Sequence, residues 1–152
     1  MYSKFQNIET PFYYYDTALL EATLKAIRDE IKPYPHFHVY YAIKANANPR
    51  LLSIIQQAGF GVDCVSGGEI QVAINAHFPT NSIVYAGVGK SDKEIIIGLR
   101  NNIFCFNVES IPELEVINQL AVKENTIANV CLRINPDVSP HTHANIITGM
   151  AE

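Results

Sequence analysis

The sequence is short of positive charge, of cysteine and of long apolar runs, and each shortage excludes a class of protein. Its 15 Asp and Glu residues outnumber 11 Lys and Arg residues. No basic cluster is present that could follow a phosphate backbone, so we expect no nucleic-acid partner. No apolar run approaches the roughly 18 residues that cross a bilayer, and no secretory signal segment stands at the start, so we expect no membrane partner.

The cysteine and histidine patterns argue against disulfides and metals. Cys64, Cys105 and Cys131 are odd in number, widely spaced and set in apolar, strand-like runs. We interpret them as buried, reduced thiols of a cytoplasmic protein. Two His-x-His pairs, at 36–38 and 141–143, have no acidic or thiol residue nearby at zinc-like spacing, so we predict no metal site.

What is present is a regular alternation of apolar strands and amphipathic helices in a chain of 152 residues, the length of one ordinary domain. After a short first strand and a helix capped by Asp16, each further strand but the last is followed by a helix. The predicted strands are 12–15, 38–43, 61–65, 83–85, 103–108 and 129–134. Near-continuous apolar strands in this alternation predict a parallel sheet covered by helices, closed as a doubly wound sheet or as a (β/α)8 barrel.

Three of the predicted helices begin with the same sequence pattern. The stretches 66–69, 91–94 and 110–113 each read S-x-x-E. This pattern is typical of a capping box, in which the serine accepts from the third helical N–H and the glutamate reaches back to the N–H of the cap.

The distribution of glycine separates the two ways of closing the sheet. A dinucleotide-binding fold needs G-x-G-x-x-G at its first strand–helix turn, but the turn at 44–48 contains no glycine. The stretch 87–91, G-V-G-K-S, superficially matches a phosphate loop, yet Val84 stands where that motif needs glycine. Chemistry placed at several strand ends favours the barrel.

The length then predicts an incomplete barrel, because eight strand–helix units typically need about 250 residues. We expect residues 1–35 to form an amino-terminal strand and helix leading into the barrel, and residues 36–152 to form its first five units. We interpret the chain as a fragment.

Lys44 is the first candidate for chemistry, because it ends an apolar strand and an ammonium is costly to place there. A lysine of this kind can act as an amine nucleophile toward a carbonyl substrate or pyridoxal phosphate. It can also simply mark a strand end and extend into solvent.

Two further strand ends carry charge. Asp63 lies at the end of the next strand, where it would either steady the Lys44 amine or form an ion pair that fixes strand register. Arg133 closes the last strand and suits a carboxylate or phenolate oxygen, or else a structural ion pair.

Six stretches, in this order, resemble one enzyme family. They are Y-A-I-K-A-N at 41–46, G-F-G-V-D-C-V-S-G-G-E-I at 59–70, Y-A-G-V-G-K-S at 85–91, F-N-V-E-S at 106–110, R-I-N-P-D-V at 133–138 and H-T-H-A-N-I-I-T-G at 141–149. The series resembles the amino-terminal half of the diaminopimelate decarboxylases. These are fold-type III pyridoxal-phosphate enzymes related to ornithine and arginine decarboxylases.

The resemblance implies a function and a set of site residues. Lys44 would hold pyridoxal 5'-phosphate, with Asp63 beside it, Arg133 near the cofactor and His143 as the histidine of the Thr-His stretch. The implied reaction is decarboxylation of meso-diaminopimelate, a small amino acid, to L-lysine by a cytoplasmic homodimer. Other site residues of the family would lie beyond Glu152, so we expect the chain alone to be inactive and poorly folded.

Three alternatives remain open. One is decarboxylation of another basic amino acid: ornithine, arginine or carboxynorspermidine. Another is a non-catalytic pyridoxal-phosphate carrier built on a single barrel. The last is a non-catalytic partner subunit, which the presence of Lys44 disfavours.

Overall fold

The computed structural model describes residues 5–134 and divides the chain into two compact units, Met1–Phe37 and His38–Glu152. In the first unit, helix α1 (Thr17–Ile31) begins as expected at Asp16, whose Oδ1 accepts a 3.1 Å hydrogen bond from the Leu19 N–H. The predicted strand at 12–15 is wrong, because these residues form no strand. Aromatic side chains favour strands only where a neighbouring strand and a packed face receive them, and all four of these side chains are exposed.

The second unit is built on five parallel strands that follow one another across the sheet in chain order. They are β1 (Tyr40–Ala42), β2 (Gly61–Cys64), β3 (Ile83–Tyr85), β4 (Cys105–Val108) and β5 (Val130–Leu132). A doubly wound sheet reverses its strand order at a switch point, and this sheet does not. The strand order therefore confirms the α/β class and favours the barrel arrangement over the doubly wound one.

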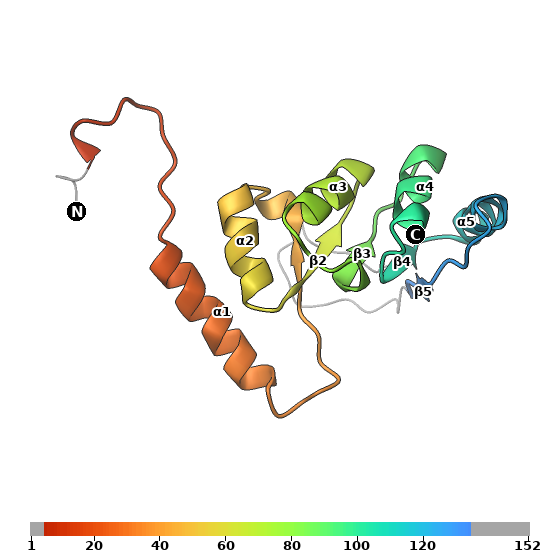
Figure 1. The fold of residues 1–152 in the computed structure, drawn as a ribbon, viewed down its shortest axis with the longest axis horizontal. Helices are drawn as coiled ribbons and strands as arrows, with labels where there is room; N and C mark the ends of the chain where they lie inside the picture. Colours follow the sequence, from red (N-terminus) through yellow and green to blue (C-terminus); the bar gives the residue numbers. More distant parts are fainter. Residues whose placement is uncertain (1–4, 135–152) are drawn as a thin grey trace, which may run out of the picture. The chain divides into compact units, whose positions relative to one another are not determined.

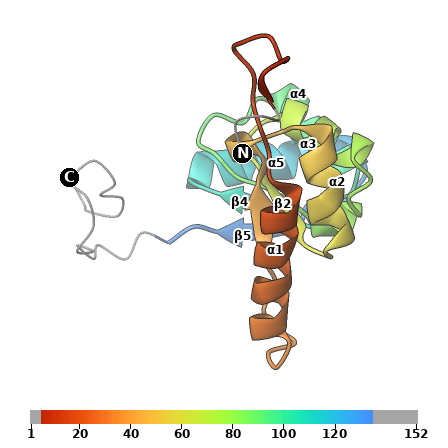
Figure 2. The same cartoon turned by 90° about the vertical axis from the view of Figure 1, so that its left-hand side faces the viewer.

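Four helices alternate with these strands and cover one face of the sheet, as the two views in Figures 1 and 2 show. They are α2 (Pro49–Gln57), α3 (Gly67–Asn75), α4 (Asp92–Arg100) and α5 (Ile111–Lys123), with short 3-10 turns η2 (Ile43–Ala45) and η3 (Thr80–Ser82). The first strand of the sheet was predicted at 38–43 and is observed at Tyr40–Ala42, and Ile43 begins the 3-10 turn η2.

The core lies between the sheet and these helices. Its strand residues alternate along β2, β3 and β4, and they are Val62, Cys64, Ile83, Tyr85, Phe106 and Val108. Leu52, Ile55, Ile70, Ile95 and Ile117 fill the helix side. Gly98 of α4 permits close packing here, because a Cβ at this position would lie 2.8 Å from the ring of Phe106. Burial also raises the pKa of the Cys64 thiol to about 12.

The other face of the sheet carries aromatic and polar side chains. The Tyr40 ring lies over Gly61, where an added Cβ would come within 2.5 Å of that ring. Tyr40 of β1 also stacks on Phe104, which precedes β4, with 6.1 Å between ring centroids, although β2 and β3 lie between β1 and β4. Strands stand about 4.8 Å apart, so this contact requires both rings to lean inward over the sheet.

The open edge explains one wrong expectation about the cysteines. Cys64 and Cys105 are buried and reduced as predicted, but Cys131 is exposed. It lies on β5, which among the described residues pairs with β4 alone. No described strand pairs with the other edge of β5, and the side chains of this strand are exposed.

The three S-x-x-E patterns start helices as predicted, but only one uses its glutamate in the expected way. The Glu94 carboxylate accepts from the Ser91 N–H at 3.1 Å. Glu69 and Glu113 instead accept from the residue before the serine, Val65 and Glu109, at 2.7 and 2.8 Å. The two serines involved are more extended, with φ of −154° and −155° against −82° for Ser91, so the chain enters these helices along a different path.

Candidate active site at the carboxyl edge of the sheet

Lys44 lies in η2, directly after β1, with an exposed side chain. Local hydrogen bonds define the turn that carries it. The Tyr41 hydroxyl donates to the Asn46 carbonyl at 3.2 Å, and Asn46 Oδ1 accepts from the Asn48 N–H at 2.9 Å. Asn48 in turn caps α2 by accepting from the Arg50 N–H at 3.0 Å. The exposed Lys44 side chain thus extends into solvent from a turn that these hydrogen bonds fix.

Asp63 lies on β2, between Ala42 of β1 and Val84 of β3. Its Oδ1 is buried and has no hydrogen-bond partner among the residues that the structure describes. Burial raises the pKa of the Asp63 carboxyl, the positive charge of Lys44 acts in the opposite direction, and Glu69 adds to the rise. The structure therefore brings the predicted lysine and carboxylate within electrostatic range of each other.

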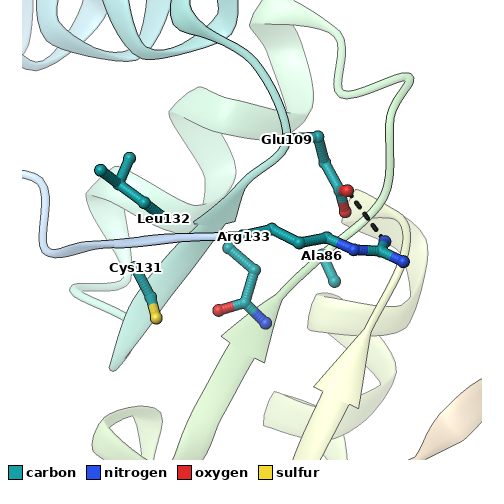
Figure 3. Close-up of a pocket in the computed structure, with 6 residues that line it drawn as sticks. Ala86, Glu109, Cys131, Leu132 and Arg133 are labelled. Carbon is teal, nitrogen blue, oxygen red and sulfur yellow. Dashed lines mark hydrogen bonds and ion pairs between the residues drawn. The ribbon is translucent and has the colours of Figure 1, made fainter. Parts of the chain in front are cut away.

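Arg133 follows β5 at the other end of the same edge. Its Nη1 donates to Glu109 Oε2 at 2.9 Å. Figure 3 shows the side chain reaching from the end of β5 toward Glu109, beside a pocket of about 320 Å³. The pocket is lined by Ala86, Asn107, Glu109, Cys131, Leu132 and Arg133.

The acidic residue that contacts Arg133 was not among the predicted site residues. Glu109 stands in the stretch F-N-V-E-S, one residue after β4, and its position at a strand end was the available signal. Lys90 was considered only as part of a phosphate-loop pattern. Its ammonium is in fact buried, and it forms an ion pair with Glu113 at 2.6 Å.

The predicted site residues thus fall into two groups. Lys44 and Asp63 lie together at one end of the sheet's carboxyl edge, while Arg133 pairs with Glu109 at the other. His143 lies outside the described residues. Within residues 5–134, no group of three or more His, Cys, Asp or Glu side chains could hold a metal ion. No helix in that range is both long and apolar enough to cross a membrane.

Comparison with known proteins identifies the family. Residues 18–152 match the model of the pyridoxal-binding domain of pyridoxal-dependent decarboxylases. The chain belongs to this family. It is 64% identical over 149 residues to the diaminopimelate decarboxylase of Bacteroides thetaiotaomicron, which covers 98% of the chain and 39% of that relative. This decarboxylase domain therefore spans well under half the length of that relative.

Two further relatives are similar to this chain, one in structure and one in sequence. A crystal structure of Helicobacter pylori diaminopimelate decarboxylase complexed with L-lysine superposes with a TM-score of 0.86 at 39% identity, covering 99% of this chain and 38% of that one. An L-glutamyl-[BtrI acyl-carrier protein] decarboxylase of Niallia circulans is 40% identical over 88% of the chain and 31% of its own length. Relatives similar in sequence to this chain therefore carry the names of decarboxylases that act on different substrates.

Proposed function

We propose that this chain is the cofactor-binding part of a pyridoxal-phosphate-dependent decarboxylase of meso-diaminopimelate. The observation that carries the proposal is the placement of the exposed Lys44 beside the half-buried Asp63, whose Oδ1 is buried, at the carboxyl ends of adjacent parallel strands. Active sites of barrel enzymes are built at this edge. Membership of the family supplies the cofactor, and the 64% identical relative supplies the substrate.

The residues of the site fit this cofactor. Asp63 Oδ1 is buried without a hydrogen-bond partner among the described residues, which is a costly state unless a bound group completes it. Lys44 would bind the aldehyde carbon of the cofactor, and Arg133 would bind an anionic oxygen. His143 is proposed as a further cofactor residue from the family pattern alone.

Each of these residues has a physical role in the proposed reaction. When bound, pyridoxal phosphate supplies an electron sink that stabilises the carbanion left by loss of CO2. Asp63, whose buried Oδ1 has no hydrogen-bond partner among the described residues, would accept a hydrogen bond from the bound group. The Arg133 guanidinium orients a planar, anionic group through paired N–H donors.

The test is decarboxylation by the complete natural polypeptide that carries this chain. We expect CO2 and L-lysine from meso-diaminopimelate with pyridoxal phosphate, and little turnover of ornithine, arginine or carboxynorspermidine. Lys44→Ala should abolish the absorbance band of lysine-bound cofactor and reduce turnover by several orders of magnitude. The matched control Lys93→Ala removes another exposed lysine, in the first turn of α4, and should leave both unchanged.

Two results would contradict the proposal. Wild-type turnover in Lys44→Ala would exclude Lys44 as the cofactor lysine. Preferred turnover of ornithine, arginine or carboxynorspermidine would replace the substrate while leaving the cofactor chemistry in place.

The assembly and location of the complete protein are part of the same proposal. The homodimer is supported by the family pattern, and the cytoplasmic location by the free cysteines. Light scattering on the complete polypeptide measures the oligomeric state, and a monomeric mass would contradict it.

A further inference from the structure

One carboxylate connects the ends of three neighbouring strands beside the pocket. Glu109 follows β4, its Oε1 accepts from the Gly87 N–H after β3 at 3.2 Å, and its Oε2 accepts from Arg133 after β5 at 2.9 Å. The Glu109 side chain is only 10% exposed, whereas that of Arg133 is 60% exposed. A carboxylate so removed from water is well paired here, because both of its oxygens accept a hydrogen bond.

The buried ammonium of Lys90 is linked to the Glu109 backbone through Glu113. The Glu109 N–H donates to Glu113 Oε2 at 2.8 Å, and Glu113 Oε1 accepts from Lys90 Nζ at 2.6 Å. Lys90 is 1% exposed and also donates to the carbonyls of Gly87 and Asn107 at 2.7 and 2.8 Å. An ammonium has three donors, and all three are used. The backbone on both sides of Glu109 is thereby fixed before any ligand binds.

This arrangement restricts the orientation of Arg133 and leaves most of its N–H donors available to a ligand. A guanidinium has five N–H donors in a rigid plane, and Glu109 accepts from one of them. The remaining donors keep a direction set by that contact, on a side chain that solvent reaches. A long, exposed arginine otherwise loses considerable rotamer freedom when it binds a ligand.

We propose that Glu109 is a positioning residue that holds the Arg133 guanidinium at the mouth of this pocket, ready to bind an anionic oxygen of the ligand. The inference rests on the proposed function and deepens it. The oxygen belongs either to the phenolate of pyridoxal phosphate or to a carboxylate of the amino-acid substrate. The competing explanation is an ion pair that only ties β5 to β4.

The experiment is a double-mutant cycle on the complete polypeptide with Glu109→Gln, Arg133→Gln and both together. The dissociation constant of pyridoxal phosphate, from absorbance titration, reports on the phenolate. The KM for meso-diaminopimelate at saturating cofactor, with kcat measured separately, reports on the carboxylate. Thermal melting of each variant monitors the fold.

We expect Glu109→Gln to weaken one of these two affinities by about tenfold to a hundredfold, which corresponds to one charge-assisted hydrogen bond. The double variant should be no weaker than Arg133→Gln, because Glu109 acts through the arginine. The matched control Glu124→Gln breaks another glutamate–arginine pair, Arg100–Glu124 at 2.7 Å, and should change neither affinity.

Three outcomes would overturn the proposal: unchanged affinities in Glu109→Gln, additive losses in the double variant, or an equal loss in Glu124→Gln. If Glu109→Gln does not fold, Arg133→Lys replaces it. This variant keeps the charge but loses the planar set of donors, so wild-type affinity in it would also overturn the proposal. Failure of the proposed function differs from all of these, because the wild-type protein would then show no lysine-bound cofactor.

Discussion

Asp63 is costly to the folded protein when no ligand is bound. Its buried Oδ1 lacks a hydrogen-bond partner among the described residues, and burial raises the pKa of the carboxyl. A folded-state pKa above the unfolded value means that the folded state binds more protons over the interval between the two values. Stability from this group is therefore fully present below the unfolded pKa of 3.8 and is lost as pH rises through the raised folded pKa.

Asp63→Asn should consequently stabilise the cofactor-free protein at pH 7.5, because the neutral amide avoids burying a charge. The gain in urea midpoint should shrink as pH falls toward 4, while cofactor affinity should drop at every pH. Asp29→Asn is the control of opposite sign, because the hydrogen bond from Lys25 lowers the pKa of the Asp29 carboxyl. A gain for Asp63→Asn that is independent of pH would contradict the account.

The residues that could be predicted from sequence are those whose position alone is unusual. Lys44 and Asp63 interrupt apolar strands, so the cost of burying charge marked them out. Glu109 also stands at a strand end, but the contacts of Glu109 and Lys90 depend on partners about 20 residues away in the chain, which the sequence does not show. Long-range pairing of this kind becomes visible only when the strand ends are assembled.

Gly98 controls how closely α4 packs on the sheet. A Cβ here would lie 2.8 and 2.9 Å from ring atoms of Phe106 and 3.1 Å from Ile103 Cδ1. Both side chains are in the core, where no side chain can move aside without shifting others. The glycine therefore serves packing rather than an unusual backbone conformation.

We expect Gly98→Ala to destabilise the protein by up to about 2 kcal/mol, because an overpacking cost of about 1–3 kcal/mol outweighs a helix-propensity gain of about 1 kcal/mol. Urea unfolding of the cofactor-free complete polypeptide measures this. Gly68→Ala in α3 is the control, since a Cβ there meets only Ser66 Oγ at 3.7 Å, and it should be neutral or slightly stabilising. Equal behaviour of the two variants would refute the packing explanation.

The elements themselves were predictable where local pattern and tertiary packing agree. The strand at 83–85 was predicted correctly, since it is apolar throughout and all three of its residues are buried. The strand expected at 12–15 was wrong because aromatic composition without a partner strand does not make a sheet. The glutamates of α3 and α5 differ from the expected capping box because the backbone path into each helix depends on the strand before it.

The sheet as described has charged residues along its carboxyl edge and two edge strands, β1 and β5. β5 pairs with β4 alone among the described residues, and Leu132 on it is 57% exposed. An exposed apolar edge strand is a template for pairing with another chain. The described residues therefore leave this side of the sheet without cover.

Residues 1–152 produced alone should self-associate and release no CO2 from meso-diaminopimelate. Light scattering at increasing concentration measures the association, which Leu132→Lys should reduce severalfold by placing a charge on the edge. Val122→Lys, on the exposed surface of α5, is the control and should have little effect. A monomeric, active wild-type chain would contradict the prediction.

The hydrogen bonds at the helix starts have a consequence for how such a sheet is assembled. Glu94 of α4 accepts from the Gly67 N–H at 2.9 Å, so it links the strand–helix pair β3–α4 to the pair β2–α3, which is synthesised before it. The ion pair between Lys90 and Glu113 links β4–α5 to β3–α4 in the same way. Each newly made unit can thus dock on a finished neighbour without waiting for distant sequence, which suits growth from one end during translation.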